Sequence, residues 1–263
     1  MGESVAEPLL EMRGIVKRFG RVEALRGVDF HVGRAEVVGL VGDNGAGKST
    51  LVKIIAGVYQ PDAGQMFFEG QPVVFRHPSE ARARGIEIVY QHLALIDLLS
   101  IDRNIFLGRE PTKRIGPIAI LDKARMEREA WSILQDIGLR RIRSPSERVA
   151  KLSGGERQSV AIGRAMHFKA KLLILDEPTA ALSVRETRRV LDHVLEVKKQ
   201  GVSVIIISHN IYHVYEVSDR IVALDHGRKI LDVPREKVTP EEVIDVIRTG
   251  APATPQPEEN QRV

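Results

Sequence analysis

The chain has 263 residues, the length of one large α/β domain or of a domain with a smaller subdomain. Its 43% hydrophobic and 28% charged residues are those of an ordinary soluble globular protein, and the absence of cysteine excludes disulfides and thiolate metal sites. The longest strictly apolar runs, such as Leu172–Leu175, are far shorter than the ~20 residues that cross a bilayer. If the protein works at a membrane, we expect a peripheral subunit.

Positive charge is concentrated in one part of the sequence. The formal net charge is only +4, yet the segment 109–151 alone carries eleven Lys or Arg residues against six Asp or Glu residues. Such a patch could face phospholipid head groups or a nucleic acid. A solvated helical surface is the favoured interpretation, because acidic residues are interleaved throughout the segment.

The first structured segment is rich in strand signals. Leu9–Val16 and Val28–Val32 are predicted to be strands, with a turn near Gly20. Phe19 stands at this turn in an otherwise polar stretch. Its ring could stack on a purine base or plug the sheet, and the local sequence favours neither.

A glycine-rich loop follows the next predicted strand. Val37–Val41 suits a buried strand, and a G-x-x-x-x-G-K-[ST] pattern then ends where a helix can begin at Lys48. Glycines let successive backbone N–H groups converge on phosphate oxygens, and the helix N-terminus adds partial positive charge. Lys48 would reach the β and γ phosphates, and the Ser49 hydroxyl would bind Mg²⁺. The predicted nucleotide-binding residues of this phosphate loop are Gly42, Asp43, Asn44, Gly45, Ala46, Gly47, Lys48, Ser49 and Thr50.

Helix and strand signals then alternate. A helix is predicted over 51–57, a short strand over 65–69 and a short helix over 78–84. Ile86–Tyr90 is a further predicted strand, which delivers Gln91 at its carboxyl end. That edge is where open α/β sheets bind ligands.

The character of the sequence changes over residues 92–150. Strand signals stop there, and Lys123–Ile137 has helical periodicity, so we expect a helical insertion between two halves of the α/β core. Ser153 is placed to cap the following helix, whose apolar residues run from Val160 to Phe168. The glycines after Ser153 leave this helix start open to close approach, which suits a second anion.

Two adjacent carboxylates end the next buried strand. Asp176 and Glu177 follow Leu172–Leu175, and one could hold Mg²⁺ while the other activates water. A further strand over 202–207 presents His209, which could hydrogen-bond a γ-phosphate.

The remaining sequence closes the core and ends in a polar tail. Helices are predicted over 184–200 and 241–249, with a hairpin between them over 220–231. Residues 251–263 are rich in Pro, Glu and Gln and are expected to be disordered, as are residues 1–8. Residues 1–8 also lack the apolar core of a secretion signal.

Together, these motifs resemble those of ABC-type ATPases. The phosphate loop, Gln91, the strand end at 172–177 and His209 occur in the family's order, with the specific LSGGERQ stretch at Leu152–Gln158 between them. The resemblance covers about residues 9–250 and implies one ABC ATPase domain there. Its fold class would be α/β: a phosphate-loop core, an N-terminal β-rich subdomain and an inserted helical subdomain at about 92–168.

The resemblance also implies roles for single residues. Lys48 and Ser49 would bind the phosphates of ATP and Mg²⁺, Gln91 would sense Mg²⁺ and the attacking water, and Asp176 would support the metal. The other assignments are Glu177 as general base, His209 as γ-phosphate contact and Phe19 as adenine-stacking ring. In this family two copies pack head to tail, so four residues would act on the partner subunit's nucleotide: Ser153, Gly154, Gly155 and Glu156.

Within the family, the sequence looks like the ATPases of bacterial importers of ribose, xylose or fructose. This finer resemblance is carried by the phosphate loop, residues 88–91, residues 104–110 and the run after Thr179. Most such ATPases fuse two nucleotide units in one chain, whereas this chain has one, which implies a homodimer in the ATP state. Ser183 also stands where many ABC proteins have Asp, a replacement found within the sugar subgroup.

The function that follows is ATP hydrolysis that drives sugar uptake through a separate integral membrane permease. The subunit would lie on the cytoplasmic face of the cell membrane, meet a solute-binding protein only indirectly and never contact the sugar. Docking is expected near residues 91–110. The apolar side chains there would either contact the permease or pack internally: Leu93, Leu95, Ile96, Leu98 and Leu99.

Three alternatives compete with a sugar importer. An importer of another solute, such as amino acids, would have the same motifs. A soluble ABC ATPase acting on nucleic acid or ribosomes is supported only by the basic insertion, because the chain has neither two nucleotide units nor a long coiled coil. A guanine-nucleotide switch is disfavoured, because the sequence contains no Asn-Lys-x-Asp motif.

Overall fold

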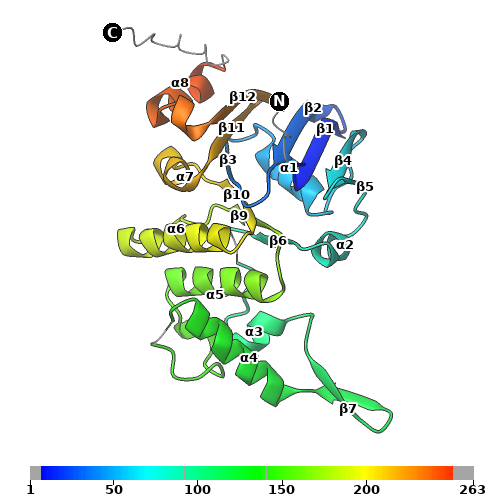
Figure 1. Cartoon of the computed structure of the whole chain (residues 1–263), viewed down its shortest axis with the longest axis vertical. Helices are drawn as coiled ribbons and strands as arrows, with labels where there is room; N and C mark the ends of the chain where they lie inside the picture. The colour runs from blue at the N-terminus through cyan, green and yellow to red at the C-terminus, as the bar shows by residue number, and fades with distance from the viewer. Residues whose placement is uncertain (1–6, 92, 140, 251–263) are drawn as a thin grey trace, which may run out of the picture.

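The centre of the molecule is a mostly parallel β-sheet (Figure 1). The computed structural model describes residues 7–91, 93–139 and 141–250. Within these residues, six strands form the sheet in the order β12-β11-β3-β10-β9-β6, and only β11 and β12 pair antiparallel. The strands are β3 (Val37–Val41), β6 (Ile86–Val89), β9 (Leu172–Asp176), β10 (Ser203–Ile207), β11 (Arg220–Asp225) and β12 (Arg228–Pro234).

Both faces of this sheet are covered by other elements. Every residue of β3 and β10 is buried, as the continuous apolar runs of parallel strands require. On one face, α1 (Lys48–Ile55) contributes Leu51 and Ile55 to a core cluster that also contains Leu40 of β3. On the other face, the second core cluster includes residues of α6 (Val184–Lys199), α7 (Ile211–Val217) and α8 (Pro240–Thr249).

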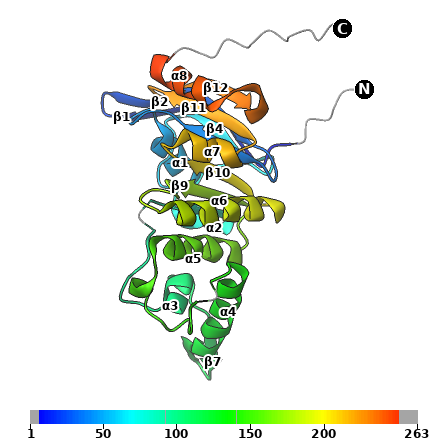
Figure 2. The same cartoon turned by 90° about the vertical axis from the view of Figure 1, so that its left-hand side faces the viewer.

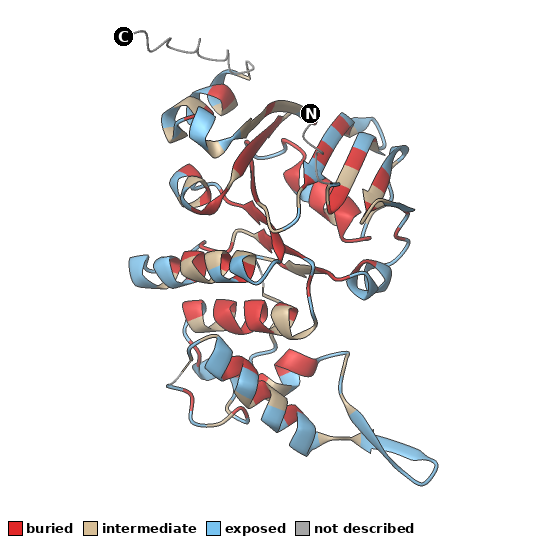
Figure 3. Cartoon of the chain, viewed as in Figure 1, coloured by how far each residue is buried: buried red, intermediate tan, exposed pale blue. Residues whose placement is uncertain are grey.

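A second, antiparallel sheet lies beside α1 (Figure 1). In the described chain it has four strands in the order β2-β1-β4-β5. They are β1 (Leu10–Phe19), β2 (Val22–Val32), β4 (Ala63–Phe68) and β5 (Gln71–Val73). One face of this sheet is apolar and buried, and Leu10, Phe30 and Phe68 on it join the same core cluster as α1. The strands therefore alternate between buried and exposed residues (Figure 3).

Helices make up most of the other end of the molecule (Figures 1 and 2). These are α3 (Ile101–Phe106), α4 (Lys123–Asp136) and α5 (Gly154–His167), with a short 3₁₀ helix at Val149–Lys151. They pack around a core cluster of their own, which includes Phe106, Leu134 and Val160. The bounds 9–250 of one domain and 92–168 of a helical subdomain stay a prediction.

The expectation that strand signals stop over 92–150 is wrong at one place. β7 (Thr112–Ile115) and β8 (Ile118–Leu121) pair as an antiparallel hairpin that projects from the helical end (Figure 2). Seven of its eight strand residues are exposed, including Ile115 and Ile118. A hairpin with no buried face has no reason to alternate apolar and polar residues, so the period-2 signal of a half-buried strand is missing.

Most other predicted elements are confirmed, with ends that shift by a few residues, except that the strand predicted at Val28–Val32 is β2, which begins six residues earlier at Val22. The helix predicted at 78–84 is α2 (Pro78–Ala83), and the helix capped by Ser153 is α5. Short elements were not predicted: β5, α3, α7 and the 3₁₀ helices at Val149–Lys151 and Arg235–Lys237. The tails predicted to be disordered lie outside the described residues, except Glu7 and Pro8, which have no helix or strand. In the described ranges, no helix is both long and apolar enough to span a membrane.

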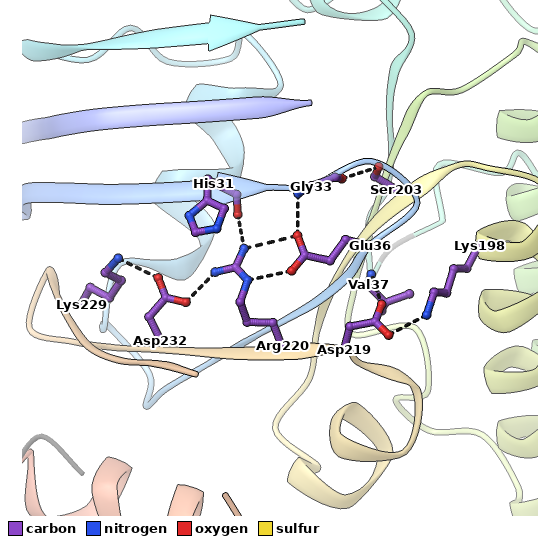
Figure 4. A network of polar contacts seen from close by, with 10 residues as sticks. All are labelled: His31, Gly33, Glu36, Val37, Lys198, Ser203, Asp219, Arg220, Lys229 and Asp232. Carbon is purple, nitrogen blue, oxygen red and sulfur yellow. Dashed lines mark hydrogen bonds and ion pairs between the residues drawn. The ribbon is translucent and has the colours of Figure 1, made fainter. Parts of the chain in front are cut away.

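A buried guanidinium joins the two sheets (Figure 4). Arg220 of β11 donates to Glu36 Oε1 at 2.7 Å, to Asp232 Oδ1 of β12 at 2.5 Å and to the carbonyl oxygen of His31 of β2 at 2.6 Å. Ser203 Oγ of β10 also donates to the carbonyl oxygen of Gly33 at 2.8 Å. These contacts fix the antiparallel sheet to the central sheet from which the site is built.

Candidate functional site

A cavity of about 290 Å³ lies where the phosphate loop meets the carboxyl ends of central strands. Its wall contains Asn44–Thr50 of the loop together with Gln91, Asp176, Glu177 and His209. These residues follow β3, β6, β9 and β10, which are neighbours in the sheet and parallel. Parallel pairing therefore brings together residues that lie up to 165 positions apart, as expected from the strand ends.

Gly42 and Asp43 line an adjoining cavity rather than this one. That cavity has a volume of about 340 Å³ and also contains Ser208, His209 and side chains of α8. His209 thus borders both cavities. Residues of the phosphate loop line each of them.

Two glycines of the loop are required by backbone conformation and space. Gly42 and Gly47 have φ angles of 137° and 107°, which side-chain-bearing residues rarely adopt. A Cβ on Gly42 would lie 2.1 Å from the carbonyl oxygen of Leu224, and one on Gly47 would lie 2.8 Å from that of Ala24. The N-cap residue of α1, Gly47, has no side chain. The first N–H groups of the helix are therefore left without a side-chain acceptor.

Lys48 is buried and held by the loop that precedes it. Lys48 is only 7% exposed. Its Nζ donates to the carbonyl oxygens of Gly42 at 2.6 Å and Asp43 at 2.9 Å. Burial lowers the pKa of Lys48, while the charges of Glu177, Asp43 and Asp176 oppose this shift. The ammonium group thus lies between backbone oxygens and carboxylates.

Asp176 and Glu177 occupy different environments although they are adjacent. Burial raises the pKa of Asp176, against the opposing charge of Lys48. Burial also raises the pKa of Glu177, against the opposing charge of His209. The N–H of Glu177 donates to the carbonyl oxygen of Ile207 at 2.8 Å, and its backbone has a left-handed φ of 52°.

The two carboxylate oxygens of Glu177 differ, because one accepts a hydrogen bond and the other has no hydrogen-bond partner among the described residues. Ser208 Oγ donates to Oε2 at 3.3 Å. His209 Nε2 lies 3.3 Å from Oε1, within ion-pair distance but without hydrogen-bond alignment. Oε1 is therefore buried with no hydrogen-bond partner among the described residues. Such an oxygen in a polar cavity suits a water molecule or a ligand proton.

The LSGGERQ stretch lies apart from this cavity. Ser153 caps α5: its Oγ accepts the N–H of Glu156 at 3.3 Å, and Glu156 Oε2 accepts the N–H of Ser153 at 2.9 Å. In the described chain, the wall of the 290 Å³ cavity contains no residue of Ser153–Glu156. One copy of the chain thus presents two separate helix starts.

Phe19 also lies outside the cavity wall. It is 42% exposed at the end of β1, and its ring packs edge-on against Tyr59 with 5.2 Å between centroids. Lys17 Nζ lies 5.5 Å from the centroid of the same ring. The residue is neither a plug of the sheet interior nor, in this conformation, part of the cavity.

Two contributors to the site were not predicted. Ala24 of β2 lines the cavity and offers its carbonyl oxygen beneath Gly47, but an alanine in a strand gives no chemical signal. Ser208, directly before His209, was not assigned a role, although its hydroxyl donates to the carboxylate of Glu177. Its position directly after a buried strand was the available signal.

The residues present fit a magnesium nucleotide. Lys48 and the uncapped start of α1 suit phosphate oxygens. Ser49, Gln91 and Asp176 line the same cavity and offer the hydroxyl, amide and carboxylate oxygens that Mg²⁺ prefers.

Comparison with known proteins agrees with this geometry. Residues 25–180 match the family model described as ABC transporter. The chain is 49% identical to a xylose/arabinose import ATP-binding protein of Sulfolobus acidocaldarius, over 92% of this chain and 95% of the relative. It is 46% identical to a fructose import ATP-binding protein of Rhizobium meliloti, over 95% and 97%. It is 47% identical to a ribose import ATP-binding protein of Rubrobacter xylanophilus, but the match covers only 44% of that longer relative.

Solved structures agree as well. An ATP-binding cassette of an ABC transporter in its ADP conformation has a TM-score of 0.78 and 27% identity, over 92% of this chain and 96% of its own. A component of an ABC transporter complex from Clostridium perfringens has a TM-score of 0.74 and 26% identity, over 92% and 94%. The chain belongs to the ABC transporter family. Within that family it is an ATP-binding component, an ATPase.

Proposed function

We propose that this chain is the ATP-hydrolysing subunit of an importer that takes up a monosaccharide. It would dock on a separate integral membrane permease at the cytoplasmic face of the membrane. The nearly full-length similarity to xylose/arabinose and fructose import proteins supports the sugar class. The observation that carries the hydrolytic part is the buried, unpaired Oε1 of Glu177 in the phosphate-loop cavity.

Phosphate binding is the first task of the site. Lys48 Nζ is held by two carbonyl oxygens, and phosphate oxygens of ATP would replace or join these as acceptors. The uncapped N–H groups at the start of α1 supply further donors and the favourable end of the helix dipole. This cradle neutralises charge on the phosphoryl group, the main catalytic requirement of phosphoryl transfer.

Activation of water is the second task, and Glu177 is the proposed base. Its unpaired Oε1 can accept a proton from water, and Ser208 fixes the other oxygen. The raised pKa of Glu177 makes it a better proton acceptor than an exposed carboxylate. His209 lies 3.3 Å from the same Oε1, so it can orient the water or contact the γ-phosphate.

Ser49, Gln91 and Asp176 are the proposed ligands of Mg²⁺. When bound, the ion would neutralise negative charge on the phosphates. Burial raises the pKa of Asp176, and the positive charges of Lys48 and Lys53 oppose that effect, as a bound cation would do further. Asp176 can therefore act as an anionic ligand there.

A second copy of the chain would complete the site. The proposed homodimer places Ser153, Gly154, Gly155 and Glu156 of one copy on the nucleotide of the other. The separation of these residues from their own chain's cavity supports this arrangement. ATP would then hold the two copies together, and hydrolysis would release them.

The docking surface for the permease is proposed at residues 91–110. The apolar cluster divides here: Leu93 and Leu95 pack against the core, whereas Ile96 is 44% and Leu98 76% exposed. Asn104 is completely buried beneath them and binds the backbone of Ile96 on both sides. A rigid loop with outward apolar side chains suits a protein partner.

The test is a co-purification from detergent extract of the native host. Glu177→Gln protein loaded with ATP and Mg²⁺ serves as bait, and the Lys48→Ala variant, which lacks the phosphate-binding ammonium, serves as its control. We expect a polytopic membrane protein to be retained by the bait. When that partner is combined with the wild-type chain instead, the ATPase activity of the complex should rise with a monosaccharide and its binding protein. Capture of ribosomal or nucleic-acid material instead would contradict the importer.

A further inference from the structure

One side chain, Glu186, joins the start of α6 to the start of α5. It forms a capping box with Ser183: its Oε2 accepts from Ser183 N at 3.1 Å and from Ser183 Oγ at 2.8 Å. Its other oxygen, Oε1, accepts the N–H of Gly155 at 3.2 Å. One carboxylate therefore caps two helices whose contacting residues lie 31 positions apart.

The close approach of Glu186 also explains one glycine of the LSGGERQ stretch, Gly155. A Cβ on Gly155 would lie 2.8 Å from both Cβ and Cγ of Glu186, and one on Gly154 would lie 2.9 Å from Leu182 Cδ2. Neither glycine has a positive φ. Gly155 is therefore required by the close approach of Glu186 and not by backbone conformation, whereas the tip of the Leu182 side chain near Gly154 could move aside.

The bridging carboxylate is strongly held in its charged form. The pKa of Glu186 is lowered to about 2, chiefly by its hydrogen bonds with Ser183, with contributions from Gly155 and Ser153. Two helix N-termini also favour a negative charge at this point. Gly155 is buried whereas Ser153 and Gly154 are exposed, so Glu186 holds the inner side of the turn and leaves its outer side accessible.

Glu186 lies in the first turn of α6, and a short turned segment connects this helix to the proposed base Glu177. The N–H of Ala180 donates to the carbonyl oxygen of Glu177 at 3.2 Å, and the N–H of Leu182 donates to that of Thr179 at 3.4 Å. Ser183 then caps α6. Glu186 therefore links two parts of the same chain: the segment that follows its own base, Glu177, and the start of α5, which is proposed to bind the nucleotide of the other copy.

We propose that Glu186 is a positioning residue. It holds the start of α5, Ser153–Glu156, against the turn that connects Glu177 to α6. This contact keeps the start of α5 in the position in which it can bind the nucleotide of a second copy. This inference rests on the proposed function, in which that helix start acts across the dimer. Without the carboxylate, the N–H of Gly155 loses its partner and the two helix starts are no longer tied. Formation of the ATP-bound dimer then weakens, while each copy's own cavity is unchanged.

The test separates nucleotide binding from dimer formation. Glu186→Ala and Glu186→Gln are made in the Glu177→Gln protein. The affinity of the dilute monomer for a fluorescent ATP analogue is compared with ATP-driven dimerisation in the analytical ultracentrifuge. We expect Glu186→Ala to weaken dimerisation about tenfold, since a charge-assisted hydrogen bond is lost, and to change monomer affinity by less than about twofold. Glu186→Gln keeps one acceptor oxygen and should be intermediate.

Two matched variants complete the design. Glu242→Ala removes the equivalent capping-box carboxylate of α8 and should dimerise normally. Ser153→Arg places a bulky cation at the helix start itself and should abolish the dimer but not nucleotide binding. Normal dimerisation of both Glu186 variants, or an equal loss in Glu242→Ala, would overturn the inference and leave the proposed function standing. A Glu177→Gln parent that binds ATP without dimerising would overturn both.

Discussion

Glu177 combines a largely buried carboxylate, an oxygen without a hydrogen-bond partner among the described residues, and a left-handed backbone. Each of these features costs folding free energy, and such costs are found where the surrounding structure is built for function. Here the N–H of Glu177 is fixed by Ile207 and Oε2 by Ser208, both at the end of β10. The neighbouring strand therefore holds the residue in a conformation that its own sequence would not favour.

The pH dependence of hydrolysis should report Glu177. A base must be deprotonated, and burial raises the pKa of this carboxyl above its ordinary 4.5. Turnover is therefore expected to fall as the pH drops through this raised pKa, and Glu177→Gln should lower turnover about 10²- to 10⁴-fold. Steady-state hydrolysis from pH 5 to 8, with nucleotide affinity measured alongside, checks both.

The same variant also gives a check on folding. Because the folded-state pKa of Glu177 is raised, its ionisation at neutral pH costs stability, and glutamine removes that cost. The melting temperature of Glu177→Gln at pH 7 should equal or exceed that of the wild type. Undiminished hydrolysis by a folded variant would remove Glu177 as the base.

At the scale of elements, the loop before α3 is organised by a single buried amide. Asn104 is 0% exposed. Its Oδ1 accepts the N–H of Ile96 at 2.7 Å, and its Nδ2 donates to the carbonyl oxygens of Ile96 and Ser100 at 3.0 Å each. The exposed side chains of Ile96 and Leu98 thus stand on a loop whose backbone is fixed from within.

Replacing this amide should loosen the loop without touching the nucleotide site. Asn104→Ala leaves buried backbone groups unsatisfied, which costs about 1–3 kcal/mol. We expect faster hydrogen exchange at Ile96 and weaker permease binding, with nucleotide affinity unchanged. Leu98→Ala is the matched comparison, since it should weaken permease binding while leaving exchange at Ile96 as it was. Unchanged exchange in Asn104→Ala would show that other contacts hold the loop.

At the scale of the whole molecule, Arg220 connects the antiparallel sheet to the central sheet. Burial disfavours its charge, but hydrogen bonds to Glu36 and Asp232 outweigh this and raise its pKa. Burial likewise would raise the pKa of Asp232, and its bonds to Lys229 and Arg220 instead hold that pKa below the ordinary 3.8. The stability from Asp232 is thus fully present above 3.8 and is lost as the pH falls through the lowered value.

Removal of the Arg220 guanidinium should lower the free energy of unfolding. Arg220→Met leaves the partly buried carboxylates of Glu36 and Asp232 without their shared partner, although Asp232 keeps its ion pair with Lys229. Breaking a fully buried ion pair costs about 3–5 kcal/mol, and the loss here should lie at or below the lower end of that range. Urea unfolding at pH 7 measures the loss, which should shrink in the acid range as the carboxylates become protonated. Arg13→Met removes the cation of an exposed pair with Glu11 and should have little effect. Equal effects of the two substitutions would contradict the role of the network.

Local patterns were sufficient to predict most of the site. The phosphate loop follows a strand, and Gln91, Asp176, Glu177 and His209 all follow strands that are parallel and adjacent. The carboxyl ends of parallel, adjacent strands lie at the same edge of a sheet. The sequence alone therefore predicted that these residues lie close together. The cap of α5 by Ser153 and the start of α1 at Lys48 were also predicted from neighbouring residues alone.

Only the tertiary structure decided which groups remain unpaired and which distant groups touch. The bridge from Glu186 to Gly155, the hydroxyl of Ser208 on Glu177 and the clamp of Arg220 on His31 all join separate elements. The β7–β8 hairpin and the position of Phe19 outside the cavity were likewise beyond local signals. Sequence periodicity records which face of an element is buried, whereas a hydrogen bond between two elements depends on how those faces are packed.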